Sequence, residues 1–219
     1  MVALDDLSLD ILSGEICCIL GTSGSGKSTL LNLLAGLEKA SRGSILIRGK
    51  NIGKMNERQL ALFRQKNIGF VFQSYNLLPS LSALENVSLP LVFRGIKKEK
   101  REQLARALLQ DVGLKTHLKH KPAEMSGGQQ QRVGIARAFV GSPPIILADE
   151  PTGNLDSKTS LEVIQLMLKL AREKQQTLVI VTHDSEVAGF ADKTVFIRDG
   201  KIAEVIINNT NVGERRDET

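Results

Sequence analysis

The residues best suited to chemistry lie in one glycine-rich stretch near the start of the chain. This stretch consists of Gly21, Thr22, Ser23, Gly24, Ser25, Gly26, Lys27, Ser28 and Thr29. It matches the phosphate-binding pattern G-x-x-x-x-G-K-[ST] in full. Glycines allow the backbone to curl so that successive N–H groups point at phosphate oxygens, and a helix beginning near Lys27 adds the positive end of its dipole. Because Lys27 can reach the outer phosphates of a nucleotide and the Ser28 hydroxyl can hold a magnesium ion, the stretch predicts a nucleotide site.

The sequence on both sides of this stretch agrees with that interpretation. The apolar run 16–20 comes immediately before it, and the leucine-rich segment 30–35 follows. The alternative, a chance glycine-rich turn, explains neither flank. We therefore expect a phosphate loop between a buried strand and the start of a helix.

Side chains that can bind metal or move a proton follow three other apolar runs: Gln73, Asp149, Glu150 and His183. Asp149 suits a second magnesium contact, and the adjacent Glu150 can poise a water molecule for attack. Gln73 can offer its amide oxygen to magnesium or to the attacking water, and His183 is placed to touch a γ-phosphate. Each residue is weak evidence by itself, since a surface Asp-Glu pair, a polar strand end and a structural histidine are all common.

A further polar stretch, Ser126, Gly127, Gly128 and Gln129, has the S-x-x-Q form of a helix capping box. Glycines are unfavourable inside a helix, so two of them in its first turn suggest the close approach of another group, such as a phosphate at the positive end of the helix. A plain helix cap is the alternative, and the spacing alone does not decide between the two.

The elements that must position these residues alternate between strands and helices, which predicts a mainly parallel α/β sheet. We expect strands at 2–4, 7–11, 16–20, 44–49, 68–72, 145–148, 177–181, 194–197 and 201–206. We expect helices after the phosphate loop and at 56–64, 83–92, 99–112, 128–140 and 157–173. Ligands bind at the carboxyl ends of the strands in such sheets. The strands that end near Leu20, Phe72, Ala148 and Val181 should therefore bring their polar residues together.

The segment from about 74 to 125 has a different character, and we expect it to form a helical subdomain inserted in the core. Leu104, Leu108 and Val112 recur at a spacing of four residues, which gives its second helix one apolar stripe. The basic stretch 94–106 is more typical of a solvated helix start than of a binding surface. Residues 1–219 are otherwise expected to form one domain, with a frayed polar tail from about residue 208.

Composition and charge narrow the classes of protein that fit. The 219 residues are 42% hydrophobic and 24% charged, as in an ordinary globular protein, and no apolar run approaches the ~18 residues of a membrane span. We find no secretion leader and expect a cytoplasmic protein that can dock on a membrane. Cys17 and Cys18 are adjacent in a predicted strand, so their side chains should point to opposite faces without forming a disulfide. The net charge of +5 permits contact with nucleic acid or an anionic membrane but requires neither.

Taken together, these motifs resemble those of the ATP-binding-cassette (ABC) ATPases. The motifs occur in the order seen in that family: the phosphate loop (Walker A), Gln73 (Q-loop), residues 125–132 (signature), residues 145–150 (Walker B), residues 154–156 (D-loop) and His183 (switch histidine). The resemblance covers essentially the whole chain. It points to the branch that includes the macrolide-export and lipoprotein-release ATPases, with the cell-division ATPase nearby, through residues 68–73, 76–79 and 83–87.

The resemblance implies a fold and a reaction. The fold would be α/β, with a P-loop NTPase (RecA-like) core, a mainly parallel sheet, an antiparallel β subdomain and the inserted α-helical subdomain. The reaction would be hydrolysis of ATP to ADP and phosphate. Glu150 would be the general base and His183 would hold the γ-phosphate and the water. Mg2+ would be bound by Ser28, Gln73 and Asp149.

The resemblance also implies partners. Two copies of the chain would face each other head to tail, with each ATP between the Walker A of one copy and the signature of the other. Residues 126–129 would then clamp the γ-phosphate in trans. The helical subdomain would grip an integral membrane permease, which would keep the protein peripheral on the inner face of the cell membrane.

Two positions depart from the family's pattern. Met125 stands where leucine is usual in the signature, a swap that conserves volume and should be mild. The family usually stacks adenine on an aromatic residue upstream of the phosphate loop, but no aromatic occurs before Phe63. Either the chain is truncated at its start or base stacking is absent, and in the second case we expect weaker and less base-selective ATP binding.

Three functions stay open at this stage. The first is the ATPase subunit of an exporter or of a lipid-substrate extractor. The second is a mechanical regulator of the cell-division type, in which ATP cycling moves a membrane protein without transport. The third is a soluble cassette ATPase acting on DNA or ribosomes. Since such proteins usually carry tandem cassettes or added modules that this sequence lacks, we expect no nucleic-acid partner.

Overall fold

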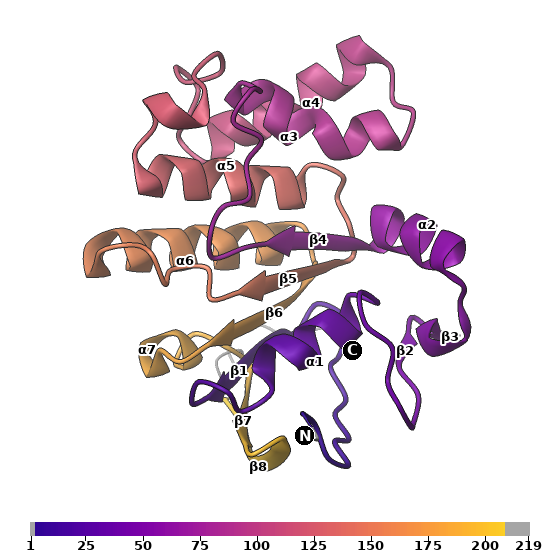
Figure 1. Ribbon diagram of the computed structural model, residues 1–219. Coiled ribbons are helices and arrows are strands. Elements are labelled where there is room, and N and C mark those ends of the chain that lie inside the picture. The colour runs from indigo at the N-terminus through magenta and orange to yellow at the C-terminus, as the bar shows by residue number, and fades with distance from the viewer. Residues whose placement is uncertain (1–2, 209–219) are drawn as a thin grey trace, which may run out of the picture.

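The computed structural model describes residues 3–208, which form an α/β structure (Figure 1). Its strands are β1 (Ile16–Gly21), β2 (Leu46–Ile47), β3 (Lys50–Asn51), β4 (Ile68–Val71), β5 (Ile145–Asp149), β6 (Thr177–Thr182), β7 (Lys193–Arg198) and β8 (Lys201–Ile207). Its helices are α1 (Lys27–Leu34), α2 (Glu57–Asn67), α3 (Ala83–Phe93), α4 (Lys98–Asp111), α5 (Gly127–Phe139), α6 (Ser157–Glu173) and α7 (Ser185–Ala188). None of the helices within residues 3–208 combines the length and the apolar character that a membrane span requires.

One mixed sheet organises the molecule. Six strands form it in the order β4-β5-β6-β1-β7-β8, and a separate hairpin joins β2 to β3. The strands from β4 to β7 in that order run parallel, and only the edge pair β7–β8 is antiparallel. The register sets Leu20 of β1 beside Thr182 of β6, and Asp149 of β5 beside Val181 of β6. The predicted convergence of the strand ends at one edge of the sheet is therefore confirmed.

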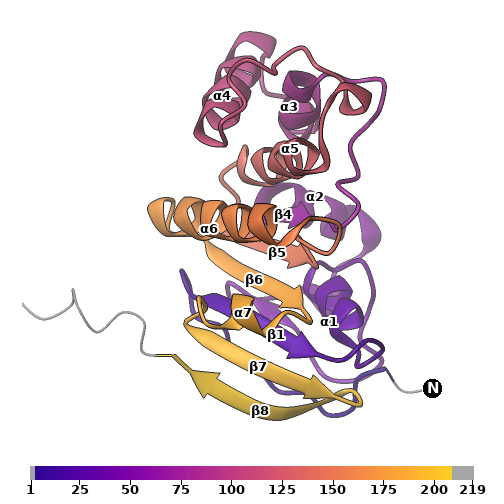
Figure 2. The same ribbon diagram turned by 90° about the vertical axis from the view of Figure 1, so that its left-hand side faces the viewer.

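Helices cover both faces of the sheet (Figure 2). Alternation along β1 decides which side chain meets which helix, because successive strand residues point to opposite faces. Cys17 belongs to the cluster that includes Leu31 of α1, whereas Cys18 belongs to the cluster built with α5 and α6. Both cysteines are buried and free, as predicted. The helix after the phosphate loop and the signature helix α5 thus lie on opposite faces.

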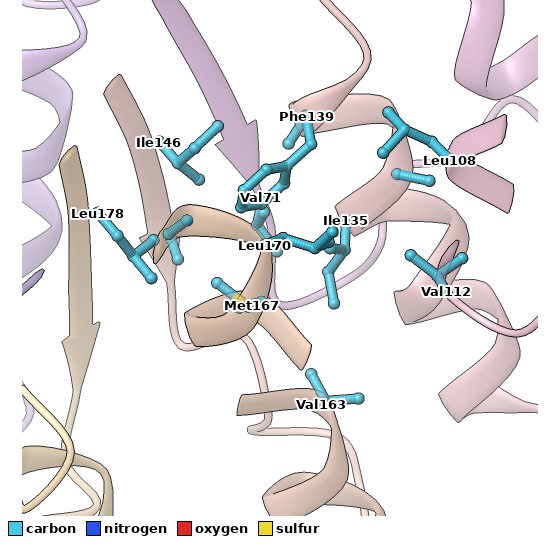
Figure 3. Packing of buried hydrophobic residues seen from close by; sticks show 14 of the residues in the cluster. Val71, Leu108, Val112, Ile135, Phe139, Ile146, Val163, Met167, Leu170 and Leu178 are labelled. Atoms are coloured by element: carbon cyan, nitrogen blue, oxygen red, sulfur yellow. The ribbon is translucent and has the colours of Figure 1, made fainter. Parts of the chain in front are cut away.

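The larger of these clusters joins the sheet to α5, α6 and the α3–α4 pair (Figure 3). Its buried side chains include Val71, Leu108, Ile135, Phe139, Ile146 and Met167. The edge strand β4 approaches α5 so closely that a Cβ on Gly69 would lie 2.2 Å from the Ala138 carbonyl oxygen. Glycine at this position therefore lets the signature helix pack directly on the strand that leads to Gln73.

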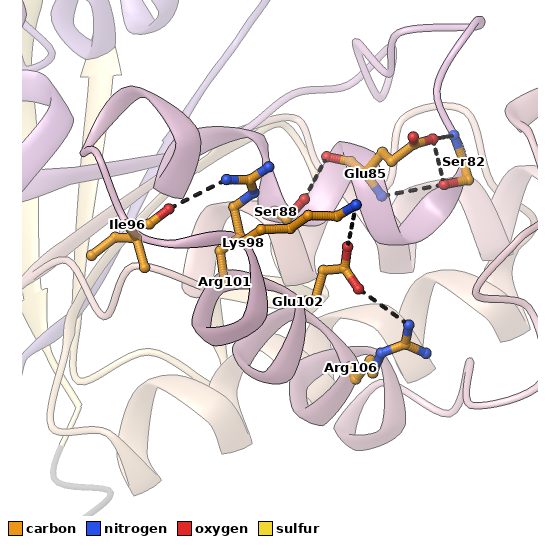
Figure 4. Close-up of polar contacts among 8 residues, drawn as sticks. All are labelled: Ser82, Glu85, Ser88, Ile96, Lys98, Arg101, Glu102 and Arg106. Atoms are coloured by element: carbon orange, nitrogen blue, oxygen red, sulfur yellow. Dashed lines mark hydrogen bonds and ion pairs between the residues drawn. The ribbon is translucent and has the colours of Figure 1, made fainter.

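Helices α3 and α4 pack on each other and on α5, at the end of the molecule remote from β8 (Figure 1). A capping box begins α3, since Glu85 N donates to Ser82 Oγ at 3.3 Å and Ser82 N donates to Glu85 Oε2 at 2.8 Å (Figure 4). In α4, Glu102 lies between Lys98 and Arg106, at 4.0 and 3.4 Å. These exposed pairs agree with a solvated helix start for the basic stretch. The subdomain boundaries predicted at about 74 and 125 stay a prediction.

The strands predicted at the start of the chain are wrong. Residues 3–15 contain no strand, so the element at 7–11 is absent, and so is the described part of the element at 2–4. Val2 and the predicted tail beyond Asn208 lie outside the described residues. The apolar residues of this segment pack against the cluster beneath α1 without a ladder partner: Leu4, Leu7, Leu9 and Ile11. Their alternation with polar residues reflects one partly buried side of the segment and not pairing in a sheet.

Two other boundaries also differ. The strand predicted at 44–49 is shortened to β2, because Arg48 and Gly49 both have positive φ (51° and 73°) and form the turn between β2 and β3. Helix α2 runs on to Asn67 and gives way directly to β4. The predicted hairpin at Asp199-Gly200 is present, with φ of 49° and 77°.

Candidate nucleotide-binding site

The phosphate loop connects the end of β1 to the start of α1. Gly24 and Gly26 have φ of 79° and 101°, a backbone conformation that residues with a Cβ rarely adopt. Gly21 has no room for a side chain either, since a Cβ there would lie 2.4 Å from the Ile197 carbonyl oxygen of β7. The glycines of the motif are therefore required by the loop's own conformation and by its packing on the sheet.

Lys27 points into the curve of this loop. Only 5% of the residue is exposed, and Nζ donates to the carbonyl oxygens of Gly21 and Thr22, each at 2.8 Å. The two backbone carbonyls thus hold the ammonium group of Lys27 beside the loop's N–H groups. This arrangement suits an anion such as the outer phosphates of a nucleotide.

The Ser28 hydroxyl and the Asp149 carboxylate meet beside the loop. Ser28 Oγ donates to Asp149 Oδ1 at 3.3 Å, which joins the first turn of α1 to the end of β5. No group of three or more His, Cys, Asp or Glu side chains suited to a metal occurs among residues 3–208. A hydroxyl and one carboxylate nevertheless fit Mg2+, which usually takes few protein ligands and completes its shell with phosphate oxygens and water.

Burial raises the pKa of Asp149 above its ordinary value, and the negative charge of Glu150 adds to the rise. The hydrogen bond from Ser28 and the positive charge of Lys27 oppose it. The folded protein therefore disfavours the ionised carboxylate, a penalty that a bound divalent cation would relieve.

We expect Asp149→Asn to raise the melting temperature of the nucleotide-free protein at pH 7. Because the folded pKa lies above the unfolded one, the carboxyl group lowers stability as pH rises through these values, and its penalty is complete at neutral pH. The advantage of the variant should shrink as the pH falls towards the ordinary aspartate pKa of about 4. Melting curves from pH 4 to 8 measure this.

Asp156→Asn is the matched control, because hydrogen bonds from Thr159 lower the pKa of Asp156 instead of raising it. Its effect should have the opposite sign at pH 7 and should also fade towards acid pH. A gain for Asp149→Asn that does not change with pH would contradict the prediction.

Glu150 and His183 form a pair at the ends of β5 and β6. Glu150 Oε2 and His183 Nδ1 lie 2.6 Å apart, with the histidine side chain 66% exposed and the glutamate side chain 21% exposed. Glu150 has a φ of 44°, a left-handed conformation uncommon for residues other than glycine. Its N–H donates to the Val181 carbonyl at 2.8 Å, which holds this backbone in place. The carboxylate is thus fixed next to the metal candidate Asp149 and directed towards an exposed imidazole.

Gln73 follows β4 and reaches the segment after β5. A Cβ on Gly153 would lie 2.6 Å from Gln73 Nε2, and Asn154 Nδ2 donates to the Gln73 carbonyl at 3.1 Å. The predicted Q-loop and D-loop residues are therefore in direct contact. No hydrogen bond in the described part of the chain joins the Gln73 side chain to Ser28 or Asp149.

The signature residues form the capping box that the spacing predicted. Ser126 N donates to Gln129 Oε1 at 2.9 Å, and Gln129 N donates to Ser126 Oγ at 3.3 Å. A Cβ on Gly127 would lie 2.8 Å from the Tyr75 hydroxyl, and one on Gly128 would lie 2.7 Å from Thr159 Cγ2. A side chain at either position would displace one of these groups. The cap sits at the start of α5, on the face of the sheet opposite α1.

A comparison with models of protein families identifies the family that has these motifs. The family model of the ABC transporter matches residues 4–153. The chain belongs to the ABC transporter family. As an ABC ATPase domain it is an ATP-binding enzyme that hydrolyses ATP. Its mixed, mostly parallel sheet is the P-loop fold of that family, as predicted.

Named relatives confirm the predicted branch of the ABC family. The macrolide export ATP-binding/permease protein MacB of Pasteurella multocida is 49% identical over 199 residues, which is 91% of this chain and 30% of that longer protein. The lipoprotein-releasing system ATP-binding protein LolD of Geobacter metallireducens is 47% identical over 199 residues, which is 91% of this chain and 88% of the relative. A dimeric structure of the ATP-binding cassette MJ0796, in a post-hydrolysis state with ADP and Pi, is similar to this chain, with 44% sequence identity and a TM-score of 0.86. The match covers 94% of this chain and 90% of the MJ0796 chain.

Sequence reasoning missed the residues that join the motifs of this ABC domain to one another. Gln131 is fully buried, and its Nε2 donates to the Pro151 and Phe72 carbonyls, so that α5 is tied to the ends of both β4 and β5. Arg137 donates to the Tyr75 carbonyl at 2.8 Å. One feature of the sequence could have indicated that Gln131 is buried, because it lies one helical turn before the apolar Ile135 and so on the same face of α5.

Proposed function

We propose that two copies of this chain bind ATP and Mg2+ between them, and that closing and reopening of the pair drives a separate membrane permease. One observation carries the proposal. The phosphate loop and the signature cap belong to helices on opposite faces of one sheet, so a single copy does not offer both to the same phosphate. A second copy turned head to tail would supply the missing half of each site.

Within one copy, the phosphate loop and Lys27 hold the phosphates of ATP. Ser28, Asp149 and Gln73 would hold Mg2+, which supplies charge neutralisation on the phosphate oxygens when bound. Glu150 takes the proton of the attacking water, for which its position beside Asp149 and its largely buried side chain are suited. His183, within hydrogen-bonding distance of Glu150, orients the water and the γ-phosphate.

The signature cap of the other copy completes the site. Residues 127–129 begin a helix of 13 residues, whose first N–H groups and dipole favour an anion. Placed against the γ-phosphate in trans, this end would bind ATP but not ADP with the same contacts. Loss of the γ-phosphate on hydrolysis would therefore favour reopening. The related cassette MJ0796, solved as a dimer with ADP and Pi, supports this arrangement.

The permease would dock on an apolar groove between the sheet edge and the helices. A cavity of about 190 Å³ lies there, with a mainly apolar lining that includes Phe70, Phe72, Pro90 and Ala138. It adjoins β4, the strand that leads to Gln73, so a helix seated in the groove would sense the nucleotide site directly. We further propose an exporter or extractor of drug, peptide or lipoprotein-type substrates at the inner face of the membrane, in line with the MacB and LolD relatives.

The mass of the protein in solution with and without ATP tests the proposal. Glu150→Gln should form an ATP-dependent dimer, whereas Glu150→Gln combined with Ser126→Arg should bind ATP through its own phosphate loop yet stay monomeric. A specific ATPase activity that does not change with protein concentration would contradict a shared site. The same Glu150→Gln dimer, added with ATP to solubilised membranes, should retain a permease. Ribosomes or DNA-binding proteins alone would overturn the transport assignment.

A further inference from the structure

The back of the phosphate loop rests on two segments to which the proposed function assigns no role: residues 3–5 and the turn between β7 and β8. Gly200 in that turn donates its N–H to the Ser25 carbonyl oxygen at 3.1 Å. Asp5 in turn donates its N–H to the Gly200 carbonyl at 2.9 Å. A chain of backbone hydrogen bonds therefore runs from residues 3–5 through the turn into the loop.

Two glycines make this contact possible. A Cβ on Gly26 of the phosphate loop would lie 2.5 Å from the Ala3 carbonyl oxygen, and a Cβ on Gly200 would lie 2.7 Å from the same oxygen. Ala3 is therefore held between the loop and the β7–β8 turn with no space for a side chain on either. An exposed ion pair between Lys201 and Asp5, at 3.1 Å, joins the same two segments.

The hydrogen bond to Ser25 fixes the orientation of one peptide unit of the loop. The C=O and N–H of a trans peptide point in opposite directions. With the Ser25 C=O held towards Gly200 behind the loop, the Gly26 N–H of the same unit points to the front. The front is the side on which the loop's N–H groups can meet a phosphate.

We propose that Gly200 is a positioning residue for nucleotide binding, and that it acts by fixing the Ser25–Gly26 peptide in the orientation that presents the Gly26 N–H to ATP. The ligand is the phosphate chain of the nucleotide, so the inference rests on the proposed phosphate site and adds to it a residue from a distant turn. A side chain at position 200 would push Ala3 away, release the Ser25 carbonyl and let that peptide rotate.

Gly200→Ala tests this against Gly14→Ala. Both glycines have a φ of 77°, so an alanine at either position strains the backbone, but a Cβ on Gly14 meets no atom within 4 Å. Gly200→Ala should raise the Kd and the KM for ATP about tenfold, the effect of one lost charge-assisted hydrogen bond, while kcat at saturating ATP changes less than about twofold. Gly14→Ala should leave the Kd, KM and kcat of the wild type unchanged.

Amide hydrogen exchange of the wild-type protein gives a second measurement that needs no variant to fold. If the turn and the loop act together, ATP should slow exchange at the Gly200 N–H along with the Gly26 N–H, by about tenfold or more. The Gly14 N–H, which donates to Thr177 Oγ1 at 2.9 Å, is the internal control and should not respond. Protection of Gly26 without any change at Gly200 would overturn the proposal.

The outcomes separate this inference from the proposed function. Wild-type protein that does not bind ATP would remove the phosphate site, and the inference with it. Wild-type binding together with equal Kd values for Gly200→Ala and Gly14→Ala would overturn the inference alone. A raised Kd for Gly200→Ala with normal binding by Gly14→Ala, and joint protection of Gly26 and Gly200, supports it.

Discussion

Glu150→Gln should lower the rate of ATP hydrolysis by about 10²–10⁴-fold, because the amide keeps the shape of the side chain but cannot accept the proton of the attacking water. The binding of ATP should survive, since neither the phosphate loop nor Ser28 and Asp149 is altered. The protein should therefore accumulate in its ATP-bound, dimeric form. Phosphate release at saturating ATP, with the dimer fraction measured in the same samples, provides the readout.

Glu186→Gln is the matched control for this variant. Glu186 lines the same cavity as Glu150 and His183, but it lies in the first turn of the short helix α7 and makes no hydrogen bond to either of them. The control should hydrolyse ATP at the wild-type rate and reopen normally. Undiminished turnover by Glu150→Gln would remove Glu150 from the role of general base.

Lys27→Met should weaken ATP binding by about 10²-fold or more while leaving the protein folded. Methionine has a similar length, so the volume of the buried side chain is nearly kept, but the ammonium that would pair with the outer phosphates is lost. Two charge-assisted contacts, each contributing about 1.5–3 kcal/mol, account for an effect of this size. Calorimetric titration with ATP, alongside a thermal melt, measures both parts of the prediction.

Lys193→Met separates the phosphate effect from the general cost of changing a buried lysine. The Lys193 ammonium also donates to a backbone carbonyl, that of Asp10, at 2.8 Å, and its side chain is only 12% exposed. It lies beside Cys17, at the opposite end of β1 from the phosphate loop. This control should lower the melting temperature, because Glu15 loses its partner, but should not change ATP affinity. Equal affinities for Lys27→Met and wild type would contradict the prediction.

Several features of the molecule could be predicted because they depend on residues close together in the chain. The phosphate loop is one, since glycines at fixed positions permit φ of 79° and 101° whatever surrounds them. The capping box of Ser126 and Gln129 is another, because its hydrogen bonds span three residues. The order of strands and helices, and the polar residue after each buried strand, placed the site at one edge of a parallel sheet.

Predictions that depended on distant partners were weaker or wrong. The alternation of Leu7, Leu9 and Ile11 indicates a strand, yet the segment packs against an apolar cluster and pairs with no strand in the described part of the chain. Strand pairing is a relation between two segments, and a one-sided pattern in one of them does not require the other.

The sequence by itself determined that a phosphate-binding motif lies between β1 and α1, and that the chain belongs with the ABC ATPases. Only the tertiary structure decided which groups meet. It set Glu150 2.6 Å from His183 across 33 residues of chain, tied Gln131 to the ends of two strands, and placed Gly200 behind Ser25. The physical reason is that local conformation follows from neighbouring residues, whereas these contacts exist only after the sheet has assembled and its two faces have been packed.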